Sequence, residues 1–224
     1  MSPKPDENLA ATPFLDFDHP AVAEFARSAT AEDASDKDRA VHIYYAVRDT
    51  IRYDPYSIDL SVRGMRASTT LQAGHGWCVP KAVLLAACCR AVGIPAKLGF
   101  ADVRNHLSTE RLRQRMKTDI FYWHGYTSIF IDGNWLKATP AFNIELCQKF
   151  NLQPLEFDGH QDALFHPYDQ SGNKHMEYIR YRGEFSDLPL EKITGTMTRR
   201  YGHHRPSPEA DFAKEAENEN RIAQ

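Results

Sequence analysis

The feature that most constrains this fold is an almost wholly apolar run over residues 79–92, bounded by Gly93. A helix that is apolar on every side is buried in the middle of its domain. Residues 74–78, with the sequence GHGWC, place a glycine-rich turn directly before the run, and Gly93 suits the end of a helix. We therefore expect a buried central helix whose first turn holds Cys78, followed by a strand that starts at Ile94.

The position of Cys78 favours a reactive thiol. Unpaired backbone N–H groups at a helix N-terminus stabilise a thiolate and can lower a cysteine pKa from about 8.5 to between roughly 3.5 and 7.5. The same N–H groups can bind an oxyanion. Cys78 is therefore the candidate nucleophile, whereas Cys88, Cys89 and Cys147 are interpreted as small core residues.

Composition excludes several classes of protein. The 224 residues are 42% hydrophobic, which is enough for a substantial core, and the formal net charge of −3 provides no field for nucleic acid or an anionic membrane. The first residues do not resemble a signal peptide, and no apolar stretch reaches the roughly 18 residues of a membrane span. Four cysteines, two of them adjacent, do not form a disulfide framework. We expect a cytoplasmic protein without nucleic-acid or membrane partners, and its oligomeric state stays open.

The chain divides into four segments by pattern. Residues 1–34 are rich in proline and predict an extended lead-in with a short helix near residues 21–28. Residues 35–150 form the predicted core, which begins with a helix capped by Ser35 and contains an exposed helix or loop at residues 108–118. Residues 151–205 are expected to pack on the core as a C-terminal extension with a helix near 189–201, and residues 206–224 read as a charged, solvated tail or helix.

A tight hairpin is predicted where Asp132 and Gly133 separate two strand-like segments. If these two residues form the turn, Ile131 pairs with Asn134 and paired positions sum to 265. One face of the hairpin then carries the apolar residues of the core. His124 lies on the opposite, more polar face, with Thr139 as a diagonal neighbour.

Residues 76–97, with the sequence GWCVPKAVLLAACCRAVGIPAK, resemble the signature of the transglutaminase-like superfamily. The resemblance continues through His124 and the segment 135–140, WLKATP, and covers about residues 36 to 146. It implies an α+β, papain-like core in which the cysteine at the start of a buried helix, packed on an antiparallel sheet, attacks an amide carbonyl. His124 would be the base, a role that the thiol's need for a proton acceptor also requires.

The sequence departs from the family pattern at the third catalytic position. Thr139 stands where the family has an aspartate, and a neutral hydroxyl cannot stabilise an imidazolium as a carboxylate does. Two residues are candidates to orient His124 in its place: Thr139 by position, and Asn143, whose amide oxygen could act as in Cys-His-Asn sites.

Other residues near the thiol could contact a substrate. Trp77 could wall a groove, His75 could line it, and Gln72 begins the turn that could give a second oxyanion donor; ordinary packing is an open alternative. The scattered histidines at positions 160, 166, 175, 203 and 204 match no metal-site spacing, so we predict no metal and no cofactor. The basic residues among 111–117 are interpreted as a solvated helix face.

The sequence thus predicts a thiol enzyme acting on amide bonds of a peptide, protein or small amide through a Cys78 thioester, which ends in hydrolysis or in transfer to an amine. The alternative is a degenerate member of the same family that serves as a binding or scaffold domain, and Thr139 is the residue that favours it.

Overall fold

The computed structural model describes all residues except 1–4, 107, 165–171, 173–174, 203–209 and 224. In chain order, its elements are η1 (Pro5–Asn8), α1 (Pro20–Ser28), α2 (Asp36–Thr50), β1 (Arg52–Tyr53), α3 (Ala67–Ala73), β2 (His75–Gly76), α4 (Cys78–Ala91), β3 (Ala96–Asn105), α5 (Glu110–Met116), β4 (Ile120–Ile131), β5 (Asn134–Ala138), α6 (Ile144–Lys149), β6 (Met176–Phe185), α7 (Leu190–Tyr201) and α8 (Phe212–Ala223).

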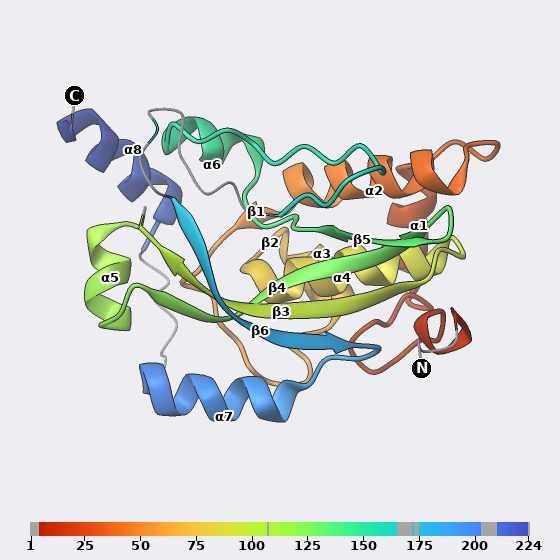
Figure 1. The fold of residues 1–224 in the computed structure, drawn as a ribbon, viewed down its shortest axis with the longest axis horizontal. Coiled ribbons are helices and arrows are strands. Elements are labelled where there is room, and N and C mark those ends of the chain that lie inside the picture. The colour runs from red at the N-terminus through yellow and green to blue at the C-terminus, as the bar shows by residue number, and fades with distance from the viewer. Residues whose placement is uncertain (1–4, 107, 165–171, 173–174, 203–209, 224) are drawn as a thin grey trace.

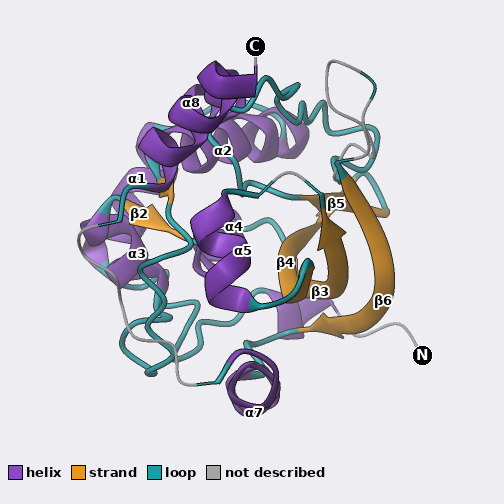
Figure 2. Ribbon diagram, turned by 90° about the vertical axis from the view of Figure 1, so that its left-hand side faces the viewer, coloured by secondary structure: helices purple, strands orange, loops and turns teal. Residues whose placement is uncertain are grey.

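A four-stranded antiparallel sheet in the order β5-β4-β3-β6 forms one layer of the molecule. Helix α4 packs against β4 and β3, and α1, α2 and α3 pack around α4 on its other sides (Figures 1 and 2). The short strands β1 and β2 pair in parallel next to the start of α4. The predicted α+β class, with a buried helix on an antiparallel sheet, is confirmed.

Helix α4 is the buried centre that the apolar run predicts. Every residue from Cys78 to Arg90 is buried, and the helix ends where Gly93 takes a φ of 82°. The Ile94 N–H then donates to the Cys89 carbonyl over 2.9 Å, a bond that satisfies one of the helix's last carbonyls. Ending the helix in this way turns the chain directly into β3.

Two buried cations fix neighbouring segments to α4. The Lys81 ammonium donates to the carbonyls of Arg48, over 2.9 Å, and Ile51, at the end of α2. Arg90 donates to carbonyls of residues 10, 96 and 186, which belong to the N-terminal segment, β3 and the chain after β6. Because buried polar groups need such partners, these contacts hold the end of α2, the N-terminal segment, the start of β3 and the chain after β6 on one helix.

The hairpin has the predicted register. Asp132 and Gly133 both have positive φ, at 48° and 83°, and Ile131 pairs with Asn134. The Thr127 hydroxyl donates to the Ala82 carbonyl over 2.9 Å, so the predicted core face does lie against α4. His124, on the other face, is also buried, with 3% of its surface exposed.

Both ends of the chain pack more closely than the sequence patterns predict. The short helix expected near residues 21–28 is α1, and its Val22 and Ala26 are fully buried, so this part of residues 1–34 is packed rather than extended. At the other end, Phe212 and Ala216 of α8 are buried, so this helix packs on the body rather than forming a solvated tail. A short amphipathic helix has only two or three apolar residues among many charged ones, so the composition of the segment does not reveal that one face of the helix is buried.

The strand β6 was not predicted. It adds to the sheet beside β3 over most of that strand, from Leu98 with Phe185 to Asn105 with Met176. Tyr178, Ile179 and Tyr181 are exposed on it. An outer strand of this kind lacks the apolar alternation that marks a strand packed on a core, so no sequence pattern indicates it.

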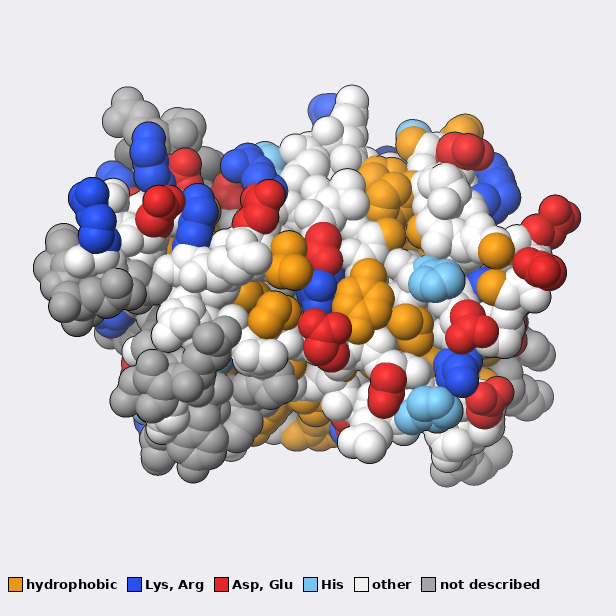
Figure 3. All heavy atoms as spheres, turned by 90° about the horizontal axis from the view of Figure 1, so that it is seen from above, with side chains coloured by type: hydrophobic (Ala, Val, Ile, Leu, Met, Phe, Trp, Pro, Cys, Tyr) orange, Lys and Arg blue, Asp and Glu red, His pale blue; other side chains and the backbone are white. Residues whose placement is uncertain are grey.

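The surface carries charges of both signs. Acidic and basic side chains are interspersed over the face of the molecule in Figure 3. Among the described residues, no helix combines the length and the apolar character needed to cross a bilayer.

Candidate active site

The thiol of Cys78 lies at an uncapped helix start. Gly74 ends α3 in the left-handed conformation, with φ 68°, and β2 then leads through Trp77 into α4. Trp77 occupies the N-cap position and makes no side-chain cap bond. The first backbone N–H groups of α4 are therefore not taken by a cap, which leaves them to interact with the thiol.

The strand β4 approaches this helix start through Gly125. A Cβ atom on Gly125 would lie 3.1 Å from the Val79 Cα and 3.4 Å from the Cys78 carbonyl oxygen, so a side chain there would push the strand and the helix start apart by a few tenths of an ångström. Hydrogen bonds from the backbone of Gly125, Val79 and Cys78 itself act to lower the pKa of the thiol. Three backbone donors, two from the helix and one from the strand, therefore surround the sulfur.

An irregularity in β4 sets up this contact. Trp123 has a φ of 59°, and the pairing of β3 with β4 shifts register between Ala101 and Val103. The Asp102 carboxylate accepts the Trp123 N–H over 3.1 Å and is held by Arg182 through contacts of 2.8 and 2.6 Å. A bulge reverses which edge of the strand the following backbone groups face. This bulge thereby fixes the orientation of His124 and Gly125.

Burial keeps both candidate catalytic groups neutral in this conformation. It raises the pKa of the Cys78 thiol to about 12, against the smaller effect of the backbone donors. It also lowers the pKa of His124 to about 3, an effect to which His175 adds and which a hydrogen bond with the Gly125 backbone opposes. A thiol and an imidazole, rather than a thiolate–imidazolium pair, are therefore the stable forms at neutral pH. Gly125 is the residue that contacts both groups.

Thr139 and Asn143, the two candidates for the third catalytic position, do not hydrogen-bond to His124. The Thr139 hydroxyl is buried and makes no hydrogen bond within the described residues. The Asn143 side-chain oxygen accepts the backbone N–H of Tyr53 over 3.1 Å. In this conformation neither of these two side-chain oxygens makes a hydrogen bond with His124. The roles predicted for Thr139 and Asn143 in orienting His124 stay predictions.

A small apolar cavity, of about 30 Å³, opens onto the thiol. It lies under α5 and α7, which come from the segments before and after β4. Trp77 lines it, and its predicted role as a wall beside a substrate stays a prediction. The remaining lining residues are apolar or aromatic: Tyr53, Pro55, Ile58, Cys78, Leu112, Met116, Phe121, Tyr122, Met197 and Tyr201. The cavity has room for about one water molecule, so this conformation is closed to a substrate.

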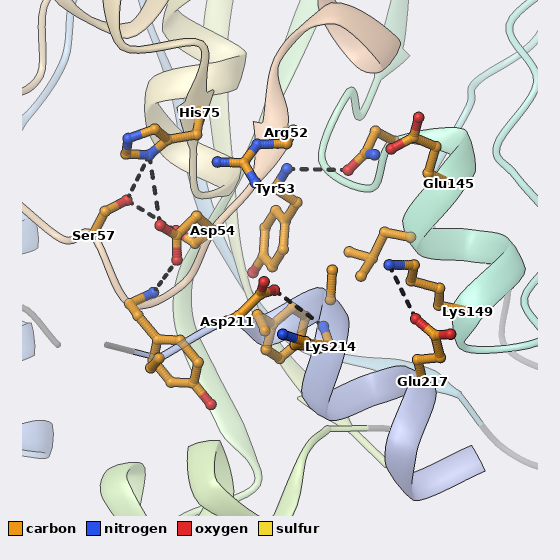
Figure 4. A pocket seen from close by; sticks show the side chains of 16 residues that line it. Arg52, Tyr53, Asp54, Ser57, His75, Glu145, Lys149, Asp211, Lys214 and Glu217 are labelled. Carbon is orange, nitrogen blue, oxygen red and sulfur yellow. Dashed lines mark hydrogen bonds and ion pairs between the residues drawn. The ribbon is translucent and has the colours of Figure 1, made fainter. Parts of the chain in front are cut away.

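His75 and Gln72 lie elsewhere. His75 lines a second, larger cavity of about 730 Å³, and Gln72 is exposed on α3 and lines neither cavity. Figure 4 shows the larger cavity, where Ser57 and Asp54 both point at His75. The Ser57 hydroxyl is 3.1 Å and the Asp54 carboxylate 3.6 Å from the same ring nitrogen, Nδ1. A catalytic triad uses both ring nitrogens, so this cluster does not have the arrangement that would activate a serine.

Metal ligands are not grouped in the described part of the chain, where no three His, Cys, Asp or Glu side chains lie together as a metal site requires. His160 contacts Lys37 over 3.4 Å. The other histidines considered from the sequence include positions 166, 203 and 204, which lie outside the described residues.

Two important neighbours of the thiol were missed from the sequence. Gly125 could have been found, because a glycine inside a strand marks a close approach of backbone. Tyr201 could not, because it comes from α7, far along the chain, and only the tertiary fold brings it to the cavity at Cys78.

The segment that contains Cys78 and His124 matches a known protein family. The profile of the transglutaminase-like superfamily matches residues 23–140, more than half of the 224 residues. No curated protein matches the chain.

Two solved structures are similar to parts of the chain. One is from Cytophaga hutchinsonii and carries the provisional name of a cysteine protease, with 19% identity over 59% of this chain and 40% of that one and a TM-score of 0.45. The other, provisionally named a protease, is from Parabacteroides distasonis, with 18% identity over 60% of this chain and 25% of that one and a TM-score of 0.40. This chain thus spans well under half the length of either.

Proposed function

The chain belongs to the transglutaminase-like superfamily, and from this membership we propose that it is a thiol enzyme that cleaves or exchanges amide bonds through a thioester at Cys78. The observation that carries the proposal is the surroundings of the sulfur. It lies at the start of α4, with backbone donors from Cys78, Val79 and Gly125 directed at it. Donors so arranged stabilise the negative charge that an attacking thiol and a carbonyl oxygen develop.

The proposed mechanism uses Cys78 and His124 in turn. The imidazole of His124 accepts the proton of the thiol as the sulfur bonds to the amide carbon, and the carbonyl oxygen becomes an oxyanion. When the carbon–nitrogen bond breaks, the imidazolium returns its proton to the leaving amine and the thioester remains. Water or a second amine then gives up a proton to His124, attacks the thioester and releases the thiol.

The oxyanion in this mechanism is bound by backbone N–H groups. Those of Cys78 and Gly125 come from two different elements, α4 and β4, whose spacing is set by the missing Cβ of Gly125. Rigid donors of this kind cost no reorganisation as charge develops, and losing one such donor typically slows turnover by roughly 100- to 1000-fold. Thr139 or Asn143 would orient the imidazole without supplying the charge of an aspartate, so we expect slower turnover than an acid-containing site would give.

The test is acyl transfer from an activated probe. N-acetyl-dipeptide p-nitrophenyl ester is offered to the protein, with and without monodansylcadaverine as amine acceptor, and p-nitrophenol release is followed. We expect turnover that Cys78→Ser and His124→Gln each lower at least 100-fold, because they remove the nucleophile and the base. The fluorescent amide appears if amines are the natural acceptors, and only the free acid appears if water is.

The matched control is Cys147→Ser, since Cys147 is another buried free cysteine on a different helix. It should leave turnover unchanged. Release that is equal in the natural protein and in Cys78→Ser would refute the proposal and favour the binding-domain reading.

A further inference from the structure

The first half of β4 presents an open edge beside the thiol. Strand β5 pairs with β4 only from Thr127 to Ile131, and within the described residues no strand pairs with residues 120–126 on that side. Strand β3 covers the other side, through pairs such as Val103 with Phe121. Unpaired edge groups are a ready template for another backbone.

A side chain from α7 occupies this edge. The Tyr122 N–H donates to the Tyr201 hydroxyl over 2.7 Å, and that hydroxyl donates to the Ile120 carbonyl over 2.9 Å. One oxygen atom therefore satisfies a donor and an acceptor that a paired strand would otherwise satisfy. The two rings also contact each other, with 5.6 Å between their centroids.

The same edge leads to Cys78. Backbone groups of alternate residues point to the same side of a strand, and the bulge at Trp123 shifts this alternation by one. Gly125, whose backbone hydrogen-bonds the thiol, therefore faces the edge that Ile120 and Tyr122 face. Tyr201 and Cys78 accordingly line one cavity.

We propose that the open edge of β4, from Ile120 to Gly125, binds the main chain of an extended peptide whose carbonyl is presented to Cys78, and that the Tyr201 hydroxyl holds the place of one residue of that peptide. The proposal rests on the proposed function, since it names the substrate of the same thiol. A single residue of the peptide would donate its N–H to the Ile120 carbonyl and accept the Tyr122 N–H at its own carbonyl. This is the pairing of parallel strands, so the peptide would run toward Gly125 in its C-terminal direction.

Apolar surroundings fit this substrate. The cavity next to the edge is lined by Leu112, Met116 and Met197, and flexible methionines adapt to side chains of different shape. Peptide binding must displace Tyr201, because a volume of about 30 Å³ leaves no room beside it. The Tyr201 side chain would thus leave the edge of β4 when the peptide binds.

The experiment compares alkylating probes that differ in one backbone N–H. Acetyl-trialanyl-glycine chloromethyl ketone and three derivatives, each N-methylated at one alanine, are reacted with the natural protein and with Tyr201→Phe. Alkylation of Cys78 is timed by peptide mass mapping. Iodoacetamide, which has no peptide backbone, reports the reactivity of the thiol itself.

We expect the parent ketone to alkylate Tyr201→Phe about fivefold faster than the natural protein, because the phenyl ring no longer competes for the two hydrogen bonds. One N-methylated derivative should lose about fivefold relative to the parent in both proteins, and the other two much less. The matched control is Tyr178→Phe, an exposed tyrosine on β6 that does not line the cavity, and it should behave as the natural protein does.

Failure of the peptide-edge proposal and failure of the proposed function would give different results. If iodoacetamide and the parent ketone both alkylate Cys78, but no single N-methylation slows the ketone in either protein, the peptide-edge proposal is wrong and the proposed function stands. If Cys78 is alkylated by neither reagent in any variant while the same cysteine reacts in the unfolded protein, both proposals fail. The scan in the natural protein decides the matter even if Tyr201→Phe does not fold.

Discussion

The two cavities on either side of Tyr53 differ in almost every respect. The one at Cys78 has a volume of about 30 Å³ and an apolar lining, whereas the one at His75 has about 730 Å³ and charged residues of both signs around it. By size alone the larger cavity would be taken for the active site. The reactive site that we propose is the smaller one, because it contains the Cys78 thiol, and it is closed in this conformation.

The two cavities also differ in what covers them. The larger cavity is bordered by Lys149, Lys214 and Glu217, side chains whose charged ends reach solvent, and by α8. The smaller one lies under side chains of α5 and α7 that pack directly over the thiol. Burial raises the pKa of Cys78, which lines this cavity, and lowers the pKa of His124, so both groups are neutral at pH 7 in this conformation.

The largest effect should follow from removing the wall between the cavities. Tyr53 packs edge-on against Phe142 and Phe212, with centroid distances of 4.8 and 5.7 Å, and lines both cavities. We expect Tyr53→Ala to lower the free energy of unfolding by about 3–5 kcal/mol and to speed alkylation of Cys78 by iodoacetamide. Guanidinium unfolding and mass mapping measure the two effects.

Tyr53→Phe is the control for this change, because it keeps the ring that separates the cavities. It should cost less than about 1.5 kcal/mol and leave the alkylation rate near that of the natural protein. A Tyr53→Ala protein as stable as Tyr53→Phe would show that the ring is not a structural wall.

Lowering the pH should have an intermediate effect on the free energy of unfolding. His124 has its pKa lowered from 6.5 to about 3, so below pH 6.5 the unfolded chain binds a proton that the folded protein does not. Stability contributed by the neutral imidazole is complete above pH 6.5 and is lost as pH falls toward 3, by about 1.4 kcal/mol per pH unit. Between pH 7 and pH 4.5 the free energy of unfolding should fall by roughly 2–3 kcal/mol through this group.

Two glutamine variants separate the cavities in this measurement. His124→Gln should flatten the decline between pH 7 and pH 4.5, whereas His75→Gln, which removes a half-buried ring in the larger cavity, should leave it as it is. Equal slopes in the two variants would contradict a neutral, buried His124.

The smallest effect belongs to the rim of the larger cavity. Lys149 and Glu217 lie 3.3 Å apart there, with 35% and 62% of their side chains exposed. Exposed pairs of this kind contribute about 0.2–1 kcal/mol, and salt screens them. A double-mutant cycle with Lys149→Ala and Glu217→Ala should give a coupling below about 1 kcal/mol that vanishes in 1 M salt, and a larger, salt-independent coupling would mean that this rim is structurally fixed.

The sequence could predict what depends on local patterns. The apolar run 79–92, the glycine after it and the Asp132–Gly133 turn specify a helix, its end and a hairpin register through backbone conformation alone. It could not predict β6, whose residues show little apolar alternation, or the cover of α5 and α7 over the thiol. Those depend on contacts between segments distant in the chain.

The site shows the same division. Cys78 and His124 could be chosen from the sequence because a helix start and a hairpin face fix their backbones, but the state of their side chains could not. The helix start predicts a lowered pKa for the thiol, whereas burial raises it to about 12 in this conformation. Burial depends on Tyr201 and Met197, more than 100 residues away, and no local pattern announces it.

Whether Cys78 is the nucleophile is tested most directly by finding which residue is acylated. The protein is mixed with N-acetyl-dipeptide p-nitrophenyl ester, quenched in acid within the first turnover, and mapped by peptide mass spectrometry. We expect one acyl group per molecule, on the sulfur of Cys78, and none on Cys147 or on Ser57 of the larger cavity. An acyl group on Ser57 or His75, with Cys78 unmodified, would contradict this role of Cys78.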